Sequence, residues 1–358
     1  MRVAVITFPL INNYGGIIQA FAMMKLLEDL GHEPILVNCQ SESKLKAISK
    51  FIIKKYLLGF MSRFKGVALT LKNKDLAKFV DTYINPKTAP IRNSQELKDY
   101  FDNNNFDACV VGSDQVFAKM GYTKFENDYS LGFINDDIIK LSYAASFGAD
   151  RYQGDSQQIE FHRINLNRFS GVSVREESGV NVCRDTFSVD STHVLDPTMM
   201  IAPSGYLDLI SADTIKLEPR NSGELFAYVL DSDEAKTKAI KSFAKSKGLS
   251  TRQINDANAT ADVISMEKWI SSIYYADHVI TDSFHGCVFC IIFNKPFHCY
   301  INNKRGADRF ISLLKMFGLE NRIINDVMND GIIDWSVVNE KLAIHKNKSK
   351  DFLRTHLG

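Results

Sequence analysis

The order of apolar and polar segments in the first 40 residues constrains the fold more than any other feature. Arg2–Phe8 is short and β-branched, which is typical of a buried strand. Ile17–Leu30 has apolar residues at helical spacing, and Gly31 is a natural helix end. A second strand is predicted over Glu33–Cys39. This β-α-β order favours a parallel sheet with a right-handed crossover connection.

The same pattern continues along the chain. Further strands are predicted over Phe106–Gly112, Lys140–Ser146, Gly171–Arg175 and His193–Asp196, each with polar residues at its carboxyl end. A polar stretch with Pro and Gly at 212–224 predicts a boundary, after which the pattern restarts at Leu225. We predict an α/β chain with Rossmann-like, doubly wound domains over 1–212 and 222–325, facing each other across a cleft, and a helical tail over 326–358.

A basic segment interrupts the first predicted domain. Residues 43–74 contain nine Lys and Arg and no Asp or Glu, with apolar residues interleaved. We predict a basic helical insertion near 43–95. It is either a solvated helix face that covers the sheet, or a surface that contacts an anionic membrane or a lipid diphosphate.

Composition excludes several classes of protein. The formal net charge of +1 gives no overall field for binding nucleic acid. No apolar run approaches the roughly 20 residues that span a bilayer, and the N-terminus does not resemble a secretion signal, so we expect a cytoplasmic protein. The six cysteines lie in apolar contexts, and the pair Cys287 and Cys290 lacks the second pair of a structural zinc site. We therefore predict buried thiols and no metal centre.

The densest functional signal is the segment Thr281–Gly286, at the end of one predicted strand and the start of a helix. Ser283 or Asp282 can cap that helix, and its N-terminus favours an anion. His285 can add a hydrogen bond or a proton, and Gly286 would let a ligand approach the backbone. The alternative is a plain capped helix with a surface histidine.

Charged residues also follow two strands of the first domain. Arg175 is placed to bind a carboxylate or phosphate with its planar guanidinium. The alternative is a surface ion pair with Glu176 or Glu177. Asp114 can act as a base or hold a sugar hydroxyl, or it can cap the next helix.

Three weaker signals complete the set. The loop with Asn13 and Tyr14 resembles a loose glycine-rich phosphate loop but matches no established nucleotide motif. Arg309 can reach an anion, or pair with Asp308 or Glu320. The segment Leu195–Thr198 is typical of a strand followed by a turn, and we interpret it as structural.

Taken together, these motifs resemble the polysaccharide pyruvyl transferase family. The matching segments occur in the family's order and span nearly the whole chain; they are Asn13–Gly15 with Gln19–Ala22, Val111–Gln115, Tyr143–Gly148, Val174–Gly179, Leu195–Thr198, Thr281–Gly286, and Arg309 with Phe310. The region 43–95 matches no segment of the family that we can name.

The resemblance implies a GT-B-like fold with the active site between two Rossmann-type domains. It implies phosphoenolpyruvate as donor, a hexose diol of a surface polysaccharide as acceptor, and no cofactor. Arg175 would hold the donor's phosphate or carboxylate, His285 would contact the donor and transfer a proton, and Asp114 would be a base or acceptor ligand. Substrate contacts are also expected from Asn13, Tyr14, Ser283, Gly286 and Arg309.

Two other functions fit the same residues. A glycosyltransferase of this fold would bind the diphosphate of a nucleotide sugar in the C-terminal domain. A non-catalytic relative would bind a glycan without any donor, although Arg175, His285 and Asp114 together favour an enzyme. The basic segment adds the hypothesis that the acceptor is lipid-linked and is met at the inner face of the cytoplasmic membrane.

Overall fold

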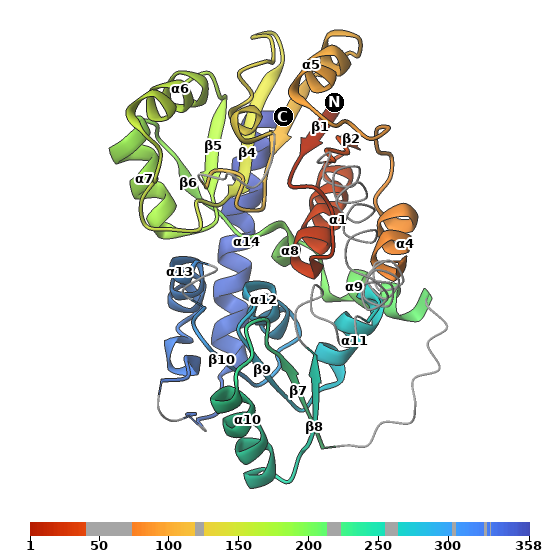
Figure 1. Ribbon diagram of the computed structural model, residues 1–358, viewed down its shortest axis with the longest axis vertical. Coiled ribbons are helices and arrows are strands. Elements are labelled where there is room, and N and C mark those ends of the chain that lie inside the picture. Colours follow the sequence, from red (N-terminus) through yellow and green to blue (C-terminus); the bar gives the residue numbers. More distant parts are fainter. Residues whose placement is uncertain are drawn as a thin grey trace, which may run out of the picture. The chain divides into compact units, whose positions relative to one another are not determined.

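The computed structural model describes residues 1–40, 74–118, 125–212, 223–254, 264–302, 306–325, 328–329 and 331–358. It divides into two compact units, drawn in Figure 1. The first unit is Met1–Met200 with Lys346–Gly358, and the second is Ile201–His345. Each unit contains one sheet in which every pairing is parallel, which confirms the predicted α/β class.

The first unit has a six-stranded sheet. Its strands, in spatial order, are β2 (Glu33–Leu36), β1 (Arg2–Ile6), β3 (Ala108–Val111), β4 (Ile139–Ala145), β5 (Gly171–Val174) and β6 (Thr192–His193). Because β2 lies on one side of β1 and β3 on the other, the strand order reverses between β1 and β3. Ligands of open α/β sheets bind outside the carboxyl ends of the strands at such a reversal.

Helices of the first unit connect these strands. They are α1 (Tyr14–Asp29), α4 (Lys74–Tyr83), α5 (Ser94–Asp102), α6 (Ser156–Leu166), α7 (Glu177–Phe187) and α8 (Pro197–Met200), with a 3₁₀ turn η1 (Glu126–Ser130). Figure 1 shows α6 and α7 side by side next to β5. Helix α1 begins three residues before the predicted start, because the Asn13 side chain accepts a hydrogen bond from the Gly16 N–H at 3.2 Å.

The second unit repeats this topology on a smaller scale. Its sheet has the spatial order β10 (Phe297–Cys299), β9 (His278–Thr281), β7 (Glu224–Tyr228) and β8 (Ser250–Ile254). Its helices are α9 (Pro203–Ala212), α10 (Glu234–Ser246), α11 (Met266–Tyr275), α12 (Phe284–Ile292) and α13 (Ala307–Phe317), with a 3₁₀ turn η3 (Glu320–Arg322). Here the strand order reverses between β7 and β9, so the Thr281–Gly286 segment lies at the reversal.

The predicted boundary at 212–224 differs from the observed division, which falls between Met200 and Ile201. Helix α9 belongs to the second unit because it packs against α11, and because the Tyr206 ring lies 4.8 Å from the Phe289 ring of α12. The first domain therefore ends twelve residues before the predicted limit of 212.

The predicted tail over 326–358 is also corrected. Its helix, α14 (Trp335–Leu357), is not a separate appendage, because Lys346–Gly358 belongs to the first unit. There the Leu195 N–H donates to the Ser349 hydroxyl oxygen at 2.9 Å.

Only part of the predicted insertion near 43–95 is described. It contains α4, and then Lys87 and Ile91 form parallel bridges with Leu36 and Cys39 beside β2. The basic residues before Lys74 lie outside the described residues, so the two interpretations of that segment stay predictions.

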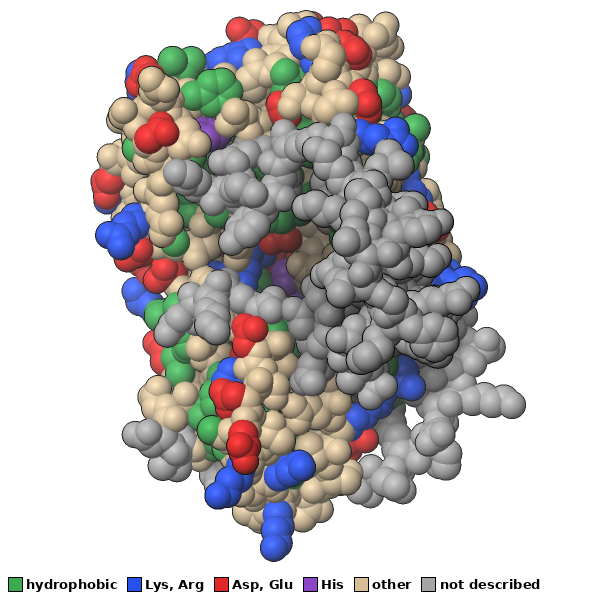
Figure 2. Space-filling view, in the orientation of Figure 1, with side chains coloured by type: hydrophobic (Ala, Val, Ile, Leu, Met, Phe, Trp, Pro, Cys, Tyr) green, Lys and Arg blue, Asp and Glu red, His purple; other side chains and the backbone are tan. Residues whose placement is uncertain are grey.

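Two expectations from composition concern the surface charge and the apolar content of the helices. On the face drawn in Figure 2, acidic and basic side chains of the described residues are interspersed and do not gather by sign. Among the described helices, none combines the length and the apolar composition that a membrane span needs. The 23-residue α14 is long enough but carries charged residues throughout.

Candidate functional site

The turn between β9 and α12 is held by the hydroxyl groups of two residues. Ser283 caps α12 by accepting a hydrogen bond from the Gly286 N–H at 3.3 Å. The Ser283 N–H donates to Thr281 Oγ1 at 3.0 Å, and this hydroxyl donates to the Tyr228 carbonyl at 2.7 Å. The helix N-terminus is thereby tied to β7 at the reversal of strand order.

Gly286 lies against the side chain of Thr281. A Cβ at this position would lie 2.4 Å from Thr281 Oγ1, well inside contact distance. The absent side chain therefore lets α12 approach the end of β9. Close approach of a ligand to this backbone stays a prediction.

Asp282 organises the neighbouring loop and does not cap the helix. Its side chain is fully buried, and its oxygens accept from the N–H groups of Leu230 and Asp231, directly after β7. The Asn302 amide donates to Asp231 at 2.6 Å and to Asp282 at 3.3 Å. Ser283 is the cap, so the two alternatives left open by the sequence are resolved.

His285 and Arg309 both contact Phe284 in the first turn of α12. The His285 ring centroid lies 5.3 Å from that of Phe284, and the Arg309 guanidinium carbon lies 5.4 Å from the same ring. His285 is 6% exposed, which excludes the alternative of a surface histidine. A helix N-terminus with a cation and an imidazole close by is suited to an anionic ligand and to proton transfer.

Arg175, directly after β5, forms a buried ion pair. Its Nη1 lies 2.9 Å from Asp196 Oδ2, and both side chains are 1% exposed. The alternative of a surface pair with Glu176 or Glu177 is therefore wrong for Arg175. Glu176 is itself buried and accepts a hydrogen bond from the Phe147 N–H at 2.7 Å.

Asp196 is the residue that the sequence interpretation missed as a functional candidate. Its Oδ2 also accepts from the Ser113 hydroxyl at 3.0 Å, and its Oδ1 accepts from the Thr198 N–H and hydroxyl at 3.0 and 2.6 Å. A carboxylate with this many donors is fixed in place. The sequence did contain a signal. Asp196 follows β6 just as Arg175 follows β5, and β5 and β6 are neighbouring strands.

The same network continues to the start of α1. The Ser113 N–H donates to Gln19 Oε1 at 2.9 Å. The Gln19 amide nitrogen in turn donates to Thr7 Oγ1 and to the Gly16 carbonyl, both at 2.9 Å. The segments that follow β1, β3, β5 and β6 are thus joined by buried hydrogen bonds along one edge of the sheet.

The remaining predicted residues of the first unit divide into two groups. The Asn13 and Asp114 side chains meet over Gly16, where a Cβ would lie 3.3 Å from Asn13 Nδ2 and from Asp114 Oδ2. The residues after Asp114, as far as Ala118, form turns, so it does not cap a helix there. Tyr14 is 1% exposed and belongs to the core, and its predicted substrate contact stays a prediction.

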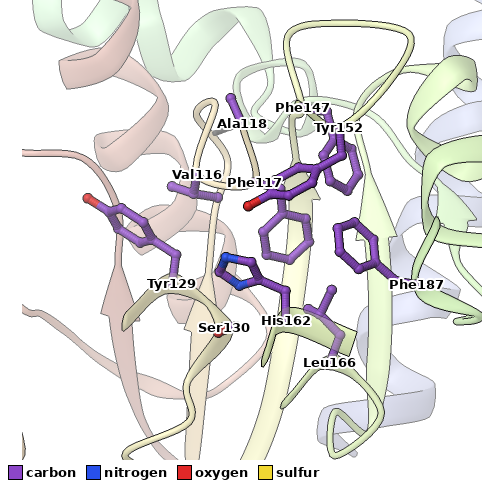
Figure 3. Close-up of a pocket in the computed structure, with 10 residues that line it drawn as sticks. All are labelled: Val116, Phe117, Ala118, Tyr129, Ser130, Phe147, Tyr152, His162, Leu166 and Phe187. Carbon is purple, nitrogen blue, oxygen red and sulfur yellow. The ribbon is translucent and has the colours of Figure 1, made fainter. Parts of the chain in front are cut away.

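A small aromatic cavity lies in another part of the first unit. Figure 3 shows the rings of His162, Tyr152 and Phe187 around it. Its volume of about 10 Å³ is room for about one water molecule, far too little for a sugar. Burial lowers the pKa of His162 to about 4, so this imidazole is neutral at physiological pH.

The cysteines are buried thiols, as predicted. Burial raises the pKa of Cys183 to about 12 and raises those of Cys287 and Cys290 as well. Within the described part of the chain, no three His, Cys, Asp or Glu side chains are grouped as a metal site requires.

A family model for polysaccharide pyruvyl transferases matches residues 13–304. The chain belongs to the polysaccharide pyruvyl transferase family. The match includes each of the predicted motifs except the arginine at 309, so the resemblance seen in the motifs is confirmed. The family is one of transferases, and a polysaccharide-modifying role follows for this pyruvyl transferase family member.

Solved structures confirm the GT-B-like fold class of this transferase. The UDP-N-acetylglucosamine 2-epimerase of Rickettsia bellii is 9% identical with a TM-score of 0.51, over 99% of this chain and 96% of that one. The UDP-GlcNAc 2-epimerase of Neisseria meningitidis, bound to UDP-GlcNAc, is 9% identical with a TM-score of 0.53, over 100% and 94%. No protein of curated function matches the sequence.

Proposed function

We propose that this transferase moves pyruvate from phosphoenolpyruvate onto two hydroxyl groups of a hexose, forming a cyclic ketal in a surface polysaccharide or its precursor. The observation that carries the proposal is the arrangement at the start of α12. There a Ser283-capped helix N-terminus, the His285 imidazole and the Arg309 guanidinium gather around Phe284. An enol phosphate that must be bound as an anion and protonated on carbon needs these groups.

The donor carries a carboxylate and a phosphate, and each needs a cationic or N–H partner. In the second unit, the α12 N-terminus and Arg309 are proposed to attract one of them. In the first unit, Arg175 is proposed to hold the phosphate or the carboxylate through its planar guanidinium. Asn13 and Asp114 are proposed to contact the acceptor, with Asp114 as a base or a hydroxyl ligand.

The reaction balances without any redox step. Protonation of C3 of phosphoenolpyruvate, for which His285 is the proposed acid, makes C2 electrophilic. One sugar hydroxyl attacks C2 and loses its proton, which restores the acid. The C2–O bond to phosphate then breaks, a second hydroxyl closes the ketal, and its proton leaves with the inorganic phosphate.

The acceptor is proposed to be a hexose such as galactose or N-acetylmannosamine, carried on a lipid diphosphate at the cytoplasmic face of the membrane. The support is the basic segment 43–74 of the sequence. Neutralising Lys54, Lys55 and Arg63 should slow turnover of a lipid-diphosphate acceptor while sparing a soluble disaccharide. Equal rates with both acceptors, unchanged by the substitutions, would contradict this part of the proposal.

Calorimetry can separate the two donor classes. Wild-type protein is expected to bind phosphoenolpyruvate and not UDP-GlcNAc, and the Arg175→Met variant is expected to bind phosphoenolpyruvate more weakly, with an affinity that is still measurable. Arg184→Met is the matched control, because Arg184 lies on the surface beside Asp185 with 61% of its side chain exposed. Binding of UDP-GlcNAc alone would favour a nucleotide-sugar glycosyltransferase, and binding of neither donor would favour a glycan-binding protein.

A further inference from the structure

The motifs of the first unit converge on a single carboxylate. Gln19, Ser113, Arg175 and Asp196 come from four separate motifs, and one chain of buried hydrogen bonds joins them. We infer that Asp196 is a positioning residue, which orients the Arg175 guanidinium for the anionic donor. This inference rests on the proposed function, because it assigns Arg175 to donor binding.

Because Arg175 and Asp196 are both buried, their ion pair determines the position of the Arg175 side chain. Both side chains are 1% exposed, so water does not compensate either charge. A guanidinium in such a place is retained only with a charged partner. The position and charge of Asp196 therefore determine where the Arg175 side chain lies.

The Asp196 carboxylate is itself immobilised from three directions. Ser113 donates to Oδ2 from the segment after β3, Thr198 donates twice to Oδ1 from α8, and Arg175 reaches Oδ2 from the segment after β5. None of these donors lies on a long flexible surface loop, since Ser113 and Thr198 are fully buried. The carboxylate is a fixed point against which the guanidinium is aligned.

The main chain of Arg175 is fixed by the strands on both sides. Its N–H donates to the Ala145 carbonyl of β4 at 3.0 Å, and its carbonyl oxygen lies 3.0 Å from His193 Nε2 of β6. With both backbone and side chain held, little rotational freedom is left to lose when an anion binds. Such preorganisation raises affinity without any added contact to the ligand.

Calorimetric titration of phosphoenolpyruvate tests this role in three variants. Asp196→Asn keeps the shape of the side chain and removes its charge, and should weaken donor binding by at least about tenfold, or about 1.4 kcal/mol. Ser113→Ala removes one hydrogen bond to the same carboxylate and should weaken binding by about threefold. Asp185→Asn, in the exposed pair with Arg184, is the matched control and should leave the affinity unchanged.

A double variant distinguishes positioning from general structural support. If Asp196 acts through Arg175, Asp196→Asn should cause no further loss of donor affinity in the Arg175→Met background. If Asp196 contributes only to stability, Asp196→Asn should lower the melting temperature and leave the donor affinity of the folded protein unchanged. That result would overturn the inference. Additive losses in the double variant would overturn it as well.

The outcomes also separate this inference from the proposed function. Wild-type protein that binds phosphoenolpyruvate, with Arg175→Met but not Asp196→Asn impaired, contradicts only the inference. Wild-type protein that does not bind phosphoenolpyruvate contradicts the proposed function and the inference with it. If Asp196→Asn does not fold, Ser113→Ala decides the question alone, and an unchanged affinity in that variant would overturn the inference.

Discussion

The carboxyl edges of the two sheets share a topology but hold their charged side chains in different ways. In the first unit, Arg175 is paired with Asp196 inside a buried hydrogen-bond network. In the second unit, Arg309 lies over the rings of Phe284 and Phe310, at 5.4 and 5.8 Å, in the first turn of α13. One arginine is held by a charge and the other by aromatic faces.

This difference predicts a division of roles between the two edges. A buried ion pair is intolerant of losing either partner, because the remaining charge has no compensation. A cation over an aromatic ring contributes less to stability. Substitutions of the first pair should therefore lower stability as well as donor affinity, while those at the second edge should lower activity with little loss of stability.

The largest expected effect is on catalysis at the second edge. His285→Ala should lower kcat by about 10²–10⁴-fold, the usual contribution of a general acid or base, with little change in melting temperature. Steady-state rates of phosphate release from phosphoenolpyruvate would measure it. His356→Ala, near the end of α14, is the control and should keep the wild-type rate. An unchanged kcat in His285→Ala would remove this residue from the proposed chemistry.

The two arginines should differ in their contribution to stability. Arg175→Ala leaves Asp196 buried and unpaired, and should destabilise the protein by about 3–5 kcal/mol. Arg309→Ala removes the cation–π contacts with Phe284 and Phe310 and should cost about 0.5–1 kcal/mol. Chemical denaturation of both variants would test the comparison, and equal losses would show that the two edges are not held differently.

Two glycines extend the comparison to the backbone. At the end of β3, Gly112 has a φ of 140°, and a Cβ there would lie 2.1 Å from the Tyr143 carbonyl oxygen. Gly112→Ala should destabilise by at least about 3 kcal/mol, because a main-chain atom of a central strand cannot move aside. Gly286→Ala meets the Thr281 side chain, and should cost about 1–3 kcal/mol.

A second substitution should rescue only one of these two variants. Thr281→Ala removes the atoms that a Cβ at Gly286 would meet, so the double variant should be more stable than the additive expectation. No side-chain truncation can relieve the contact at Gly112. Thermal unfolding measures both effects, and strict additivity of Gly286→Ala with Thr281→Ala would contradict the account of Gly286.

The last prediction concerns pH. Burial lowers the pKa of His162 to about 4 from its ordinary value of 6.5. Between these values the unfolded chain binds a proton that the folded chain excludes, so stability should fall as pH falls from 6.5 to 4, by about 3 kcal/mol at most. Melting temperatures across this range should decline less in His162→Phe. An identical decline in both proteins would contradict the assignment.

The sequence predicts local structure well where the signals are local. Helix α1 runs from Tyr14 to Asp29, close to the predicted Ile17–Leu30, because its apolar spacing and the glycine that follows it are local signals. The strand ends that carry Arg175 and the Thr281–Gly286 segment were also placed correctly. Capping and periodicity depend on near neighbours, so a single sequence contains them.

Contacts between distant residues were beyond such reasoning. The hydrogen bond from Ser113 to Asp196 joins residues 83 positions apart, and no pattern in either segment predicts the other. The same limit explains the misplaced boundary, because α9 is assigned to the second unit by its packing against α11 and by the contact of Tyr206 with Phe289. The packing of Gly286 against Thr281 was not predicted, because this contact becomes visible only in three dimensions.

Direct observation of ketal formation tests the central claim. Phosphoenolpyruvate labelled with carbon-13 at C2 would be incubated with the protein and with galactose- or N-acetylmannosamine-containing acceptors, both soluble and lipid-diphosphate-linked. We predict a new ketal carbon resonance on one acceptor, inorganic phosphate in equal amount, and loss of both with His285→Ala. A parallel incubation would supply UDP-GlcNAc in place of phosphoenolpyruvate. If phosphoenolpyruvate stays intact with every acceptor while UDP-GlcNAc is consumed, the pyruvyl transfer proposed for this chain is contradicted.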